Sequence, residues 1–277
     1  MQDMPKPPSP QDESFIRIAG SARSLGYWRL VWRRLKKRRP AMISLYFLAL
    51  MVLAVLIVPE LLPYGYDQLD LTKRFLPPSS AHLFGTDELG RDVFVRVFYG
   101  GRVSLAVGFS VALTSMLLGA MAGCTAGYLG GVTDNLMMRV VDVGQSVPRI
   151  CVLMVMSKVL GGGVLNLITI LALLEWVDVA RLARGVVLGI RGLPYIDAAR
   201  AGGVSRMRII GRHILPNSLA PLMVAASLDA GRAIRHEATL SFLGLGIPPP
   251  LPSWGNLLTN ASMYYFTVPH LVFIPGM

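Results

Sequence analysis

Long stretches without a charged side chain constrain the fold of this sequence more than any other feature. Residues 41–59 and 103–133 contain no charge, and beyond residue 247 only His270 can carry one. Nineteen residues of helix rise about 28 Å, close to the roughly 30 Å hydrocarbon thickness of a bilayer. Charged residues make up only 16% of the chain, whereas about a quarter is usual in a soluble domain. We therefore expect an all-α polytopic membrane protein.

The formal net charge of +11 arises from basic clusters that flank the apolar stretches. Ten Lys or Arg lie within residues 1–40, and seven Arg lie within residues 181–212, where Asp197 is the only acid. Clusters of this kind mark the cytoplasmic side of a membrane protein. The basic N-terminal segment 1–40 and the segment 181–217 are therefore predicted to be cytoplasmic. Nucleic-acid binding is not indicated, because the arginines border spans and do not form a surface interleaved with aromatic residues.

The apolar runs predict about six transmembrane helices. The first, over residues 41–62, has no cleavage signal and would remain as an anchor, followed by an external loop over residues 63–102. Four more helices are predicted over residues 103–127, 136–160, 164–184 and 218–237. A last apolar run begins near Tyr264 and holds about a dozen residues, too few for a full crossing. We expect this sixth helix to be incomplete.

Residues 195–217 read as two short helices joined at Gly202 and Gly203. Pro194 can start the first helix, which is rich in alanine, and the two glycines allow a sharp turn. A compact projection of this kind, edged by arginines, suits docking into the groove of a partner protein. The alternative is an interfacial helix that lies on anionic lipid.

The second of these short helices has a candidate N-cap in Ser205, and Pro216 would end it. Its apolar face is predicted to consist of Met207, Ile210 and Ile214.

The same segment resembles the EAA motif of ABC importer permeases, which is Glu-Ala-Ala, then a Gly, then Leu-Pro after a fixed interval. The motif positions are occupied by Asp197, Ala198, Ala199, Gly203, Leu215 and Pro216. Asp197 replaces the usual Glu, which keeps the charge but shortens its reach. His213 stands where an Ile is common.

Other segments resemble one branch of that family, the dipeptide, oligopeptide and nickel permeases, and specifically their C-type subunit. These segments are residues 83–92, 99–105, 180–185, 237–246, 248–249 and 253–255. The likeness extends over about residues 28–277. It implies the type I ABC importer permease fold, with a transmembrane core over residues 103–277, in a bacterial inner membrane with the N-terminus in the cytoplasm.

The resemblance also implies a function and a set of partners. The chain would form half of a translocation pathway for peptides, in a heterodimer with a second permease subunit, within membrane lipid. Two ABC ATPase subunits would use ATP and Mg, an external substrate-binding protein would deliver the substrate, and this chain would bind no cofactor. The residues implied in ATPase coupling are Asp197, Ala198, Ala199, Gly203, Ser205, Leu215 and Pro216.

The chain itself contains no Gly-x-x-x-x-Gly-Lys-Ser/Thr loop, so it lacks the usual cradle for nucleotide phosphates. The energy for transport would therefore come from a partner. Nickel or glutathione are alternative substrates for the same architecture. A channel or carrier that is not driven by ATP is the alternative from another class.

Several charges fall inside predicted spans, where each costs about 2.5–3.5 kcal/mol on insertion scales. Asp229, Arg232 and Glu237 are candidate pathway-lining residues, and Asp229 and Arg232 have the i,i+3 spacing of an ion pair. Glu175 and Asp178 are also charged residues inside a predicted span. Two alternatives remain open: these residues line a hydrated substrate path, or they form structural pairs near helix ends.

No catalytic or metal-binding residues are assigned, and we expect the chain not to be an enzyme. His236 and Glu237 lack the second His of the metalloprotease motif, since Leu240 stands in its place. Cys124 and Cys151 lie in apolar surroundings without a partner at metal-ligand spacing, and both are expected to be small buried hydrophobic residues.

Overall fold

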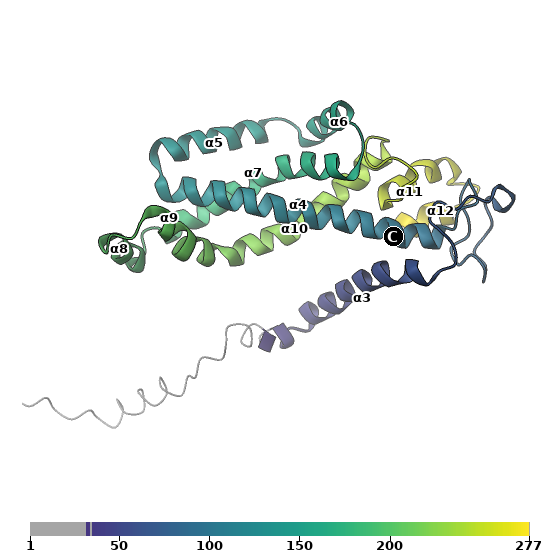
Figure 1. Ribbon diagram of the computed structural model, residues 1–277, viewed down its shortest axis with the longest axis horizontal. Coiled ribbons are helices and arrows are strands. Elements are labelled where there is room, and N and C mark those ends of the chain that lie inside the picture. Colours follow the sequence, from purple (N-terminus) through teal and green to yellow (C-terminus); the bar gives the residue numbers. More distant parts are fainter. Residues whose placement is uncertain (1–31, 34, 277) are drawn as a thin grey trace, which may run out of the picture. The chain divides into compact units, whose positions relative to one another are not determined.

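The computed structural model describes residues 32–33 and 35–276. Every element of regular secondary structure in these ranges is a helix (Figure 1). Most of the basic N-terminal segment 1–40 lies outside the described residues. The α-helices are α3 (Arg39–Leu61), α4 (Val93–Leu129), α5 (Gly131–Ser146), α6 (Arg149–Leu160), α7 (Val164–Ile190), α8 (Pro194–Ala201), α9 (Arg206–Ile209), α10 (Leu215–Phe242), α11 (Trp254–Ala261) and α12 (His270–Gly276). The expected all-α class is confirmed.

The helices differ in how well they could cross a membrane. Among the described residues, α3 and α4 are long and apolar enough, and α5 with α6 adds a third span if the bent pair is counted as one. Helices α7 and α10 have 27 and 28 residues, so they are long enough, but each carries several charged side chains. By length and composition alone, the described part of the chain therefore gives fewer clear spans than the six expected.

The chain divides into two compact units, residues 1–54 and residues 55–277. In the second unit, α4 packs along α7 and α10. Helices α8 and α9 lie at one end of these three helices, and α11 and α12 lie at the other end (Figure 1).

Small residues on α4 allow its close contact with α7. A Cβ atom at Gly123 would collide with the carbonyl oxygen of Ala180, and one at Gly127 would lie 3.0 Å from the Cβ atom of Val187. Helices in a membrane approach one another closely through such small residues. The Gly- and Ala-rich composition of this helix is therefore explained by packing.

Helix α4 begins at Val93 and not near residue 103, so the loop predicted over residues 63–102 ends at Asp92. The Asp92 side chain caps the helix by accepting a hydrogen bond from the backbone N–H of Val95 at 2.9 Å. Gly101 lies inside the helix, where a Cβ atom would come within 2.8 Å of Val55 Cγ2. Gly101 therefore serves close packing and does not end the helix.

The single helix predicted over residues 136–160 is wrong, because α5 and α6 meet at a bend of 87°. Val147 is extended, with φ −101° and ψ 137°, and Pro148 follows it. Proline lacks an N–H donor and disfavours a helical conformation in the residue before it, so the chain breaks here. The segment between α10 and the last apolar run likewise contains a helix, α11.

Candidate functional site

Residues 195–217, which we name the coupling segment after their predicted role, contain two short helices with a turn between them, as predicted. Helix α8 begins at Pro194 and ends in a turn where Gly203 has φ +74°. The Gly203 N–H donates to the Arg200 carbonyl and the Val204 N–H donates to the Ala199 carbonyl, both at 3.1 Å. This pair of bonds is a Schellman cap, which favours glycine at its left-handed position. Only Gly203 needs to be glycine for conformational reasons, since Gly202 has φ −74°.

The second short helix departs from the prediction. Ser205 occupies the N-cap position with extended backbone, but its side chain makes no capping hydrogen bond. Helix α9 passes through a π turn, Ile210–Ile214, directly into α10. Pro216 therefore does not end a helix. It lies in the first turn of α10, directly after the π turn, and the helix continues past it.

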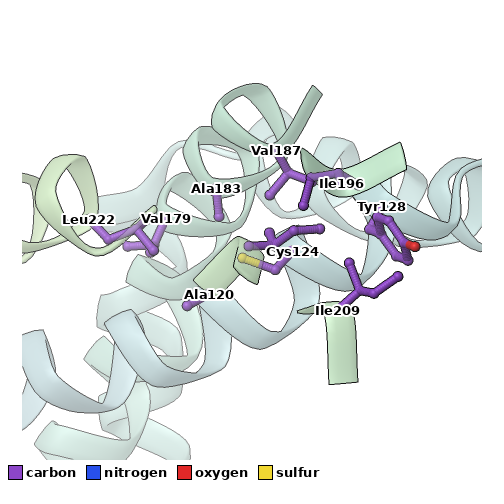
Figure 2. Close-up of a cluster of buried hydrophobic side chains, with 10 residues drawn as sticks. Ala120, Cys124, Tyr128, Val179, Ala183, Val187, Ile196, Ile209 and Leu222 are labelled. Carbon is purple, nitrogen blue, oxygen red and sulfur yellow. The ribbon is translucent and has the colours of Figure 1, made fainter. Parts of the chain in front are cut away.

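The inner face of the coupling segment is anchored by isoleucines. Ile196, Ile209 and Ile214 are fully buried. Figure 2 shows Ile196 and Ile209 directed toward side chains of α4 and α7. The buried cluster consists of Ala120, Cys124, Tyr128, Val179, Ala183, Val187, Ile196, Ile209, Ile214 and Leu222. We name this set the isoleucine core.

Two side chains that were expected to be buried, Met207 and Cys151, are exposed. Met207, which was placed on the apolar face, is 69% exposed, and Ile209 is buried instead. Cys124 is buried, as expected, whereas Cys151 is exposed.

The outer face of the coupling segment is small and charged. Asp197, Ala198, Gly203, Ser205 and Pro216 are exposed, and Ala199 and Leu215 are half-buried. Four exposed arginines surround them, namely Arg200, Arg206, Arg208 and Arg212. Arg200 donates a hydrogen bond to Asp197 at 3.1 Å. With an apolar inner face held by the helices and an open outer face, the segment has the geometry of a docking projection.

A second group of candidate residues lies further along the same helices. The charged cluster consists of Arg149 from α6, Glu175 and Asp178 from α7, and Asp229, Arg232 and His236 from α10. The predicted i,i+3 pair of Asp229 and Arg232 is present as a hydrogen bond. Glu175 and Asp229 are fully buried, so their charges are placed inside the helix packing.

Arginines bridge the acids of the charged cluster. Arg149 donates to Glu175 at 3.3 Å and to Asp178 at 3.0 Å. Arg232 Nε lies 3.6 Å from Glu175 Oε2. The sequence did not indicate Arg149 as a partner, because its position beside α7 depends on the bend between α5 and α6.

Glu237 does not join the charged cluster. It is fully buried, and its two carboxylate oxygens accept hydrogen bonds from Ser104 and Ser241, each at 2.8 Å. Ser104 also accepts from the backbone N–H of Trp254 at 3.2 Å, and Ser241 accepts from that of Ile247 at 3.1 Å. For Glu237 this geometry favours structural pairing, because the carboxylate ties the residues after α10 to α4.

A packed set of long helices, with a projecting pair of short helices at one end, agrees with the membrane permease architecture that the sequence motifs imply. The chain belongs to the family of binding-protein-dependent transport system inner membrane components, whose family model matches residues 115–277. The model of the N-terminal TM domain of oligopeptide transport permease C matches residues 26–78. The resemblance drawn from the sequence motifs is thus confirmed. Membership in this family implies ATPase and substrate-binding partners.

Curated relatives extend over most of the chain. The dipeptide transport system permease protein DppC of Bacillus subtilis is 43% identical over 237 residues, which are 86% of this chain and 74% of the relative. The oligopeptide transport system permease protein OppC of the same organism is 34% identical over 92% of this chain and 84% of the relative. The glutathione transport system permease protein GsiD of Pectobacterium atrosepticum is 36% identical over 90% of this chain and 83% of the relative.

A solved structure supports the fold. A chain of the inward-facing MetNI methionine ABC transporter superposes with a TM-score of 0.50 and 20% sequence identity. The match covers 65% of this chain and 87% of that chain. The expected ABC importer permease fold is confirmed.

Proposed function

We propose that this chain is a permease subunit of an ATP-driven importer of dipeptides or oligopeptides and forms half of the translocation pathway. The similarity to dipeptide and oligopeptide permeases supports peptide as the substrate class. The chain itself catalyses no reaction. ATP and Mg are used by two ATPase subunits, an external binding protein delivers the peptide, and a second permease subunit completes the pathway.

The proposed mechanism rests on the two faces of the coupling segment. Its outer face presents Asp197, Ala198 and Gly203 to a partner, and its inner face is fixed to α4 and α7 through Ile196 and Ile209. A partner that grips the outer face and moves would displace the long helices with it, because the buried contact is continuous. This arrangement supports a role in which ATPase closure is converted into helix movement.

The proposal includes an orientation. The coupling segment and the basic N-terminal segment face the cytoplasm, and the segment that leads from α3 to α4 faces outward. Impermeant thiol labelling of a Ser205→Cys variant tests this in oriented vesicles. The exposed Cys151 must first be replaced by Ser. Labelling from the cytoplasmic side alone is expected, and labelling from the external side would reject the orientation.

The coupling role is tested with the complete transporter reconstituted in vesicles. An Ala198→Trp variant places a bulky side chain on the outer face of α8, and we expect ATPase subunits to co-purify poorly and peptide uptake to fall about tenfold or more. The matched control is Ala198→Ser, which keeps the side chain small and should keep both properties. Unchanged uptake by the Trp variant would reject docking at this face. Uptake by the permease pair without ATPase subunits would favour the channel or carrier alternative.

Glutathione is a second candidate substrate, favoured by the 36% identity to a glutathione permease. Competition of labelled dipeptide uptake by unlabelled glutathione, by nickel and by a tripeptide separates the alternatives. Competition by the tripeptide alone is the result expected for a peptide importer.

A further inference from the structure

The charged cluster lies where charges are costly. Glu175 and Asp178 fall near the middle of α7 (Val164–Ile190), and Asp229 and Arg232 fall near the middle of α10 (Leu215–Phe242). A charge at the centre of a membrane helix costs about 2.5–3.5 kcal/mol on insertion scales. Ionisable residues at such positions face a protein interior or a hydrated cavity.

The exposed part of the cluster cannot face lipid at low cost. The side chains of Arg149, Asp178 and Arg232 are 27%, 32% and 35% exposed on the chain. Asp178 also accepts a hydrogen bond from Gln145 Nε2 at 2.7 Å. An open surface depression beside the cluster is lined by residues 144–149 and by Asp178. These side chains therefore border a concave surface that suits a hydrated path.

The cluster is close to charge balance but is not saturated with hydrogen bonds. Three carboxylates stand against two guanidinium groups and the imidazole of His236. Four polar atoms buried in it have no hydrogen-bond partner among the described residues: Glu175 Oε1, Asp229 Oδ2, Arg232 Nε and His236 Nδ1. Three of them nevertheless belong to ion pairs, since Glu175 Oε1 lies 3.2 Å from His236 Nδ1 and Arg232 Nε lies 3.6 Å from Glu175 Oε2. Buried polar groups are normally satisfied, and the unpaired Asp229 Oδ2 leaves hydrogen-bonding capacity in the cluster that a ligand could use.

We infer that the charged cluster is a substrate-contact site within the pathway, which binds the two charged ends of a zwitterionic peptide; this rests on the proposed importer function. Arg149 and Arg232 bind the terminal carboxylate, for which the guanidinium fork is well shaped. Asp178 binds the terminal ammonium group. Glu175 and Asp229 hold the arginines in place. A ligand with one sign of charge would engage only half of this arrangement.

The test compares peptides that differ only at one terminus, in the fully assembled transporter. For Arg232→Gln, we expect the KM for a free dipeptide to rise about tenfold, with a smaller change for the same peptide amidated at its C-terminus. For Asp178→Asn, we expect the same rise for the free dipeptide and a smaller change for the N-acetylated peptide. Each value is divided by that of the unmodified transporter, so the preference of the external binding protein cancels.

The matched controls are Arg184→Gln and Asp134→Asn. This second Arg–Asp pair joins α7 to α5 through two hydrogen bonds of 2.5 and 2.7 Å, but it is not part of the charged cluster. We expect these controls to change the KM for all three peptides by less than about twofold. Equal losses for all peptides in the cluster variants, or no loss, would overturn the substrate-contact assignment.

A second measurement does not require transport of an amidated or acetylated peptide. An Asp178→Cys variant, made in a background with Cys124→Ala and Cys151→Ser, is labelled by a small water-soluble thiol reagent during ATP turnover. Saturating free dipeptide should slow this labelling at least about threefold if the peptide occupies the cluster. Labelling at an unchanged rate overturns the assignment. An unmodified transporter that imports no peptide would instead overturn the proposed function, and the two failures are distinguishable.

Discussion

At the residue scale, Gly203 sets the geometry of the coupling segment. Its φ of +74° is disfavoured for residues with a Cβ atom, at a cost of about 1–2 kcal/mol. A Gly203→Val variant should therefore distort the turn and lower peptide uptake per ATP hydrolysed several-fold. The measurement is the ratio of uptake to hydrolysis in vesicles. A Gly203→Asn variant is the control, because Asn tolerates this conformation better and should keep most of the coupling. Equal ratios in the Val variant and the unmodified transporter would contradict the prediction.

Glu237 provides a second prediction at this scale. Its removal by Glu237→Ala would leave the hydroxyls of Ser104 and Ser241 without their acceptor, at a cost of about 1–3 kcal/mol for each unsatisfied group. Thermal unfolding of the purified permease should show a lowered midpoint. The control is Glu60→Ala, since the Glu60 side chain is 69% exposed in its 2.8 Å pair with Arg102 and should matter by less than about 1 kcal/mol. Similar midpoints for the two variants would refute this distinction.

Some side-chain positions could be predicted from the sequence, and others could not. The left-handed glycine and the Asp229–Arg232 pair could be predicted, because both depend on neighbours within a few residues. The burial of Ile209 in place of Met207 could not. Helix α9 has only four residues and runs into a π turn, so the helical period used to place the apolar face does not hold there.

At the scale of elements, the contact of α4 with α7 makes a sharp prediction. A Gly123→Ala variant forces a Cβ atom against the backbone oxygen of Ala180, which cannot move aside as a flexible side chain could. We expect destabilisation of about 1–3 kcal/mol. The matched control is Gly185→Ala in α7, where an added Cβ atom has nothing within 4 Å and should stabilise the helix by up to about 1 kcal/mol. Thermal midpoints that shift in the same direction would contradict this account.

The long helices were predictable from the apolar runs, whereas helix ends, breaks and the short α11 were not. The early start of α4 depends on the Asp92 cap and on a close approach to Val55, which is distant in sequence. The break between α5 and α6 depends on Pro148. The apolar run continues on both sides of this proline, so hydropathy alone predicted a single helix. Helix α11 is short, and its Gly255 packs against Ala238 of α10, with a Cβ atom there 2.5 Å from Ala238 Cα. Such ends are set by tertiary contacts that a local pattern does not contain.

At the scale of the second compact unit, α7 and α10 contribute side chains both to the charged cluster and to the core beneath the coupling segment. Glu175 and Asp229 belong to the charged cluster, and Val179 and Leu222 of the same two helices belong to the isoleucine core. We expect a displacement of the coupling segment to reach the charged cluster along α7 and α10, because both helices contribute side chains to the isoleucine core and to the cluster. The proposed docking face and the proposed substrate contact are thus joined by the same two helices.

This linkage predicts that substitutions on the inner face of the coupling segment impair transport differently from substitutions on its outer face. An Ile209→Ala variant opens a cavity in the isoleucine core, at a cost of about 2–5 kcal/mol. Because its outer face is unchanged, we expect ATPase subunits to co-purify normally and ATP hydrolysis to continue, while peptide uptake per ATP falls several-fold. The control is Met207→Ala, two residues away and 69% exposed, which should leave that ratio unchanged. Loss of the ATPase subunits from the Ile209 variant would mean that the core shapes the docking face itself, and a normal ratio would mean that movement reaches the pathway by another route.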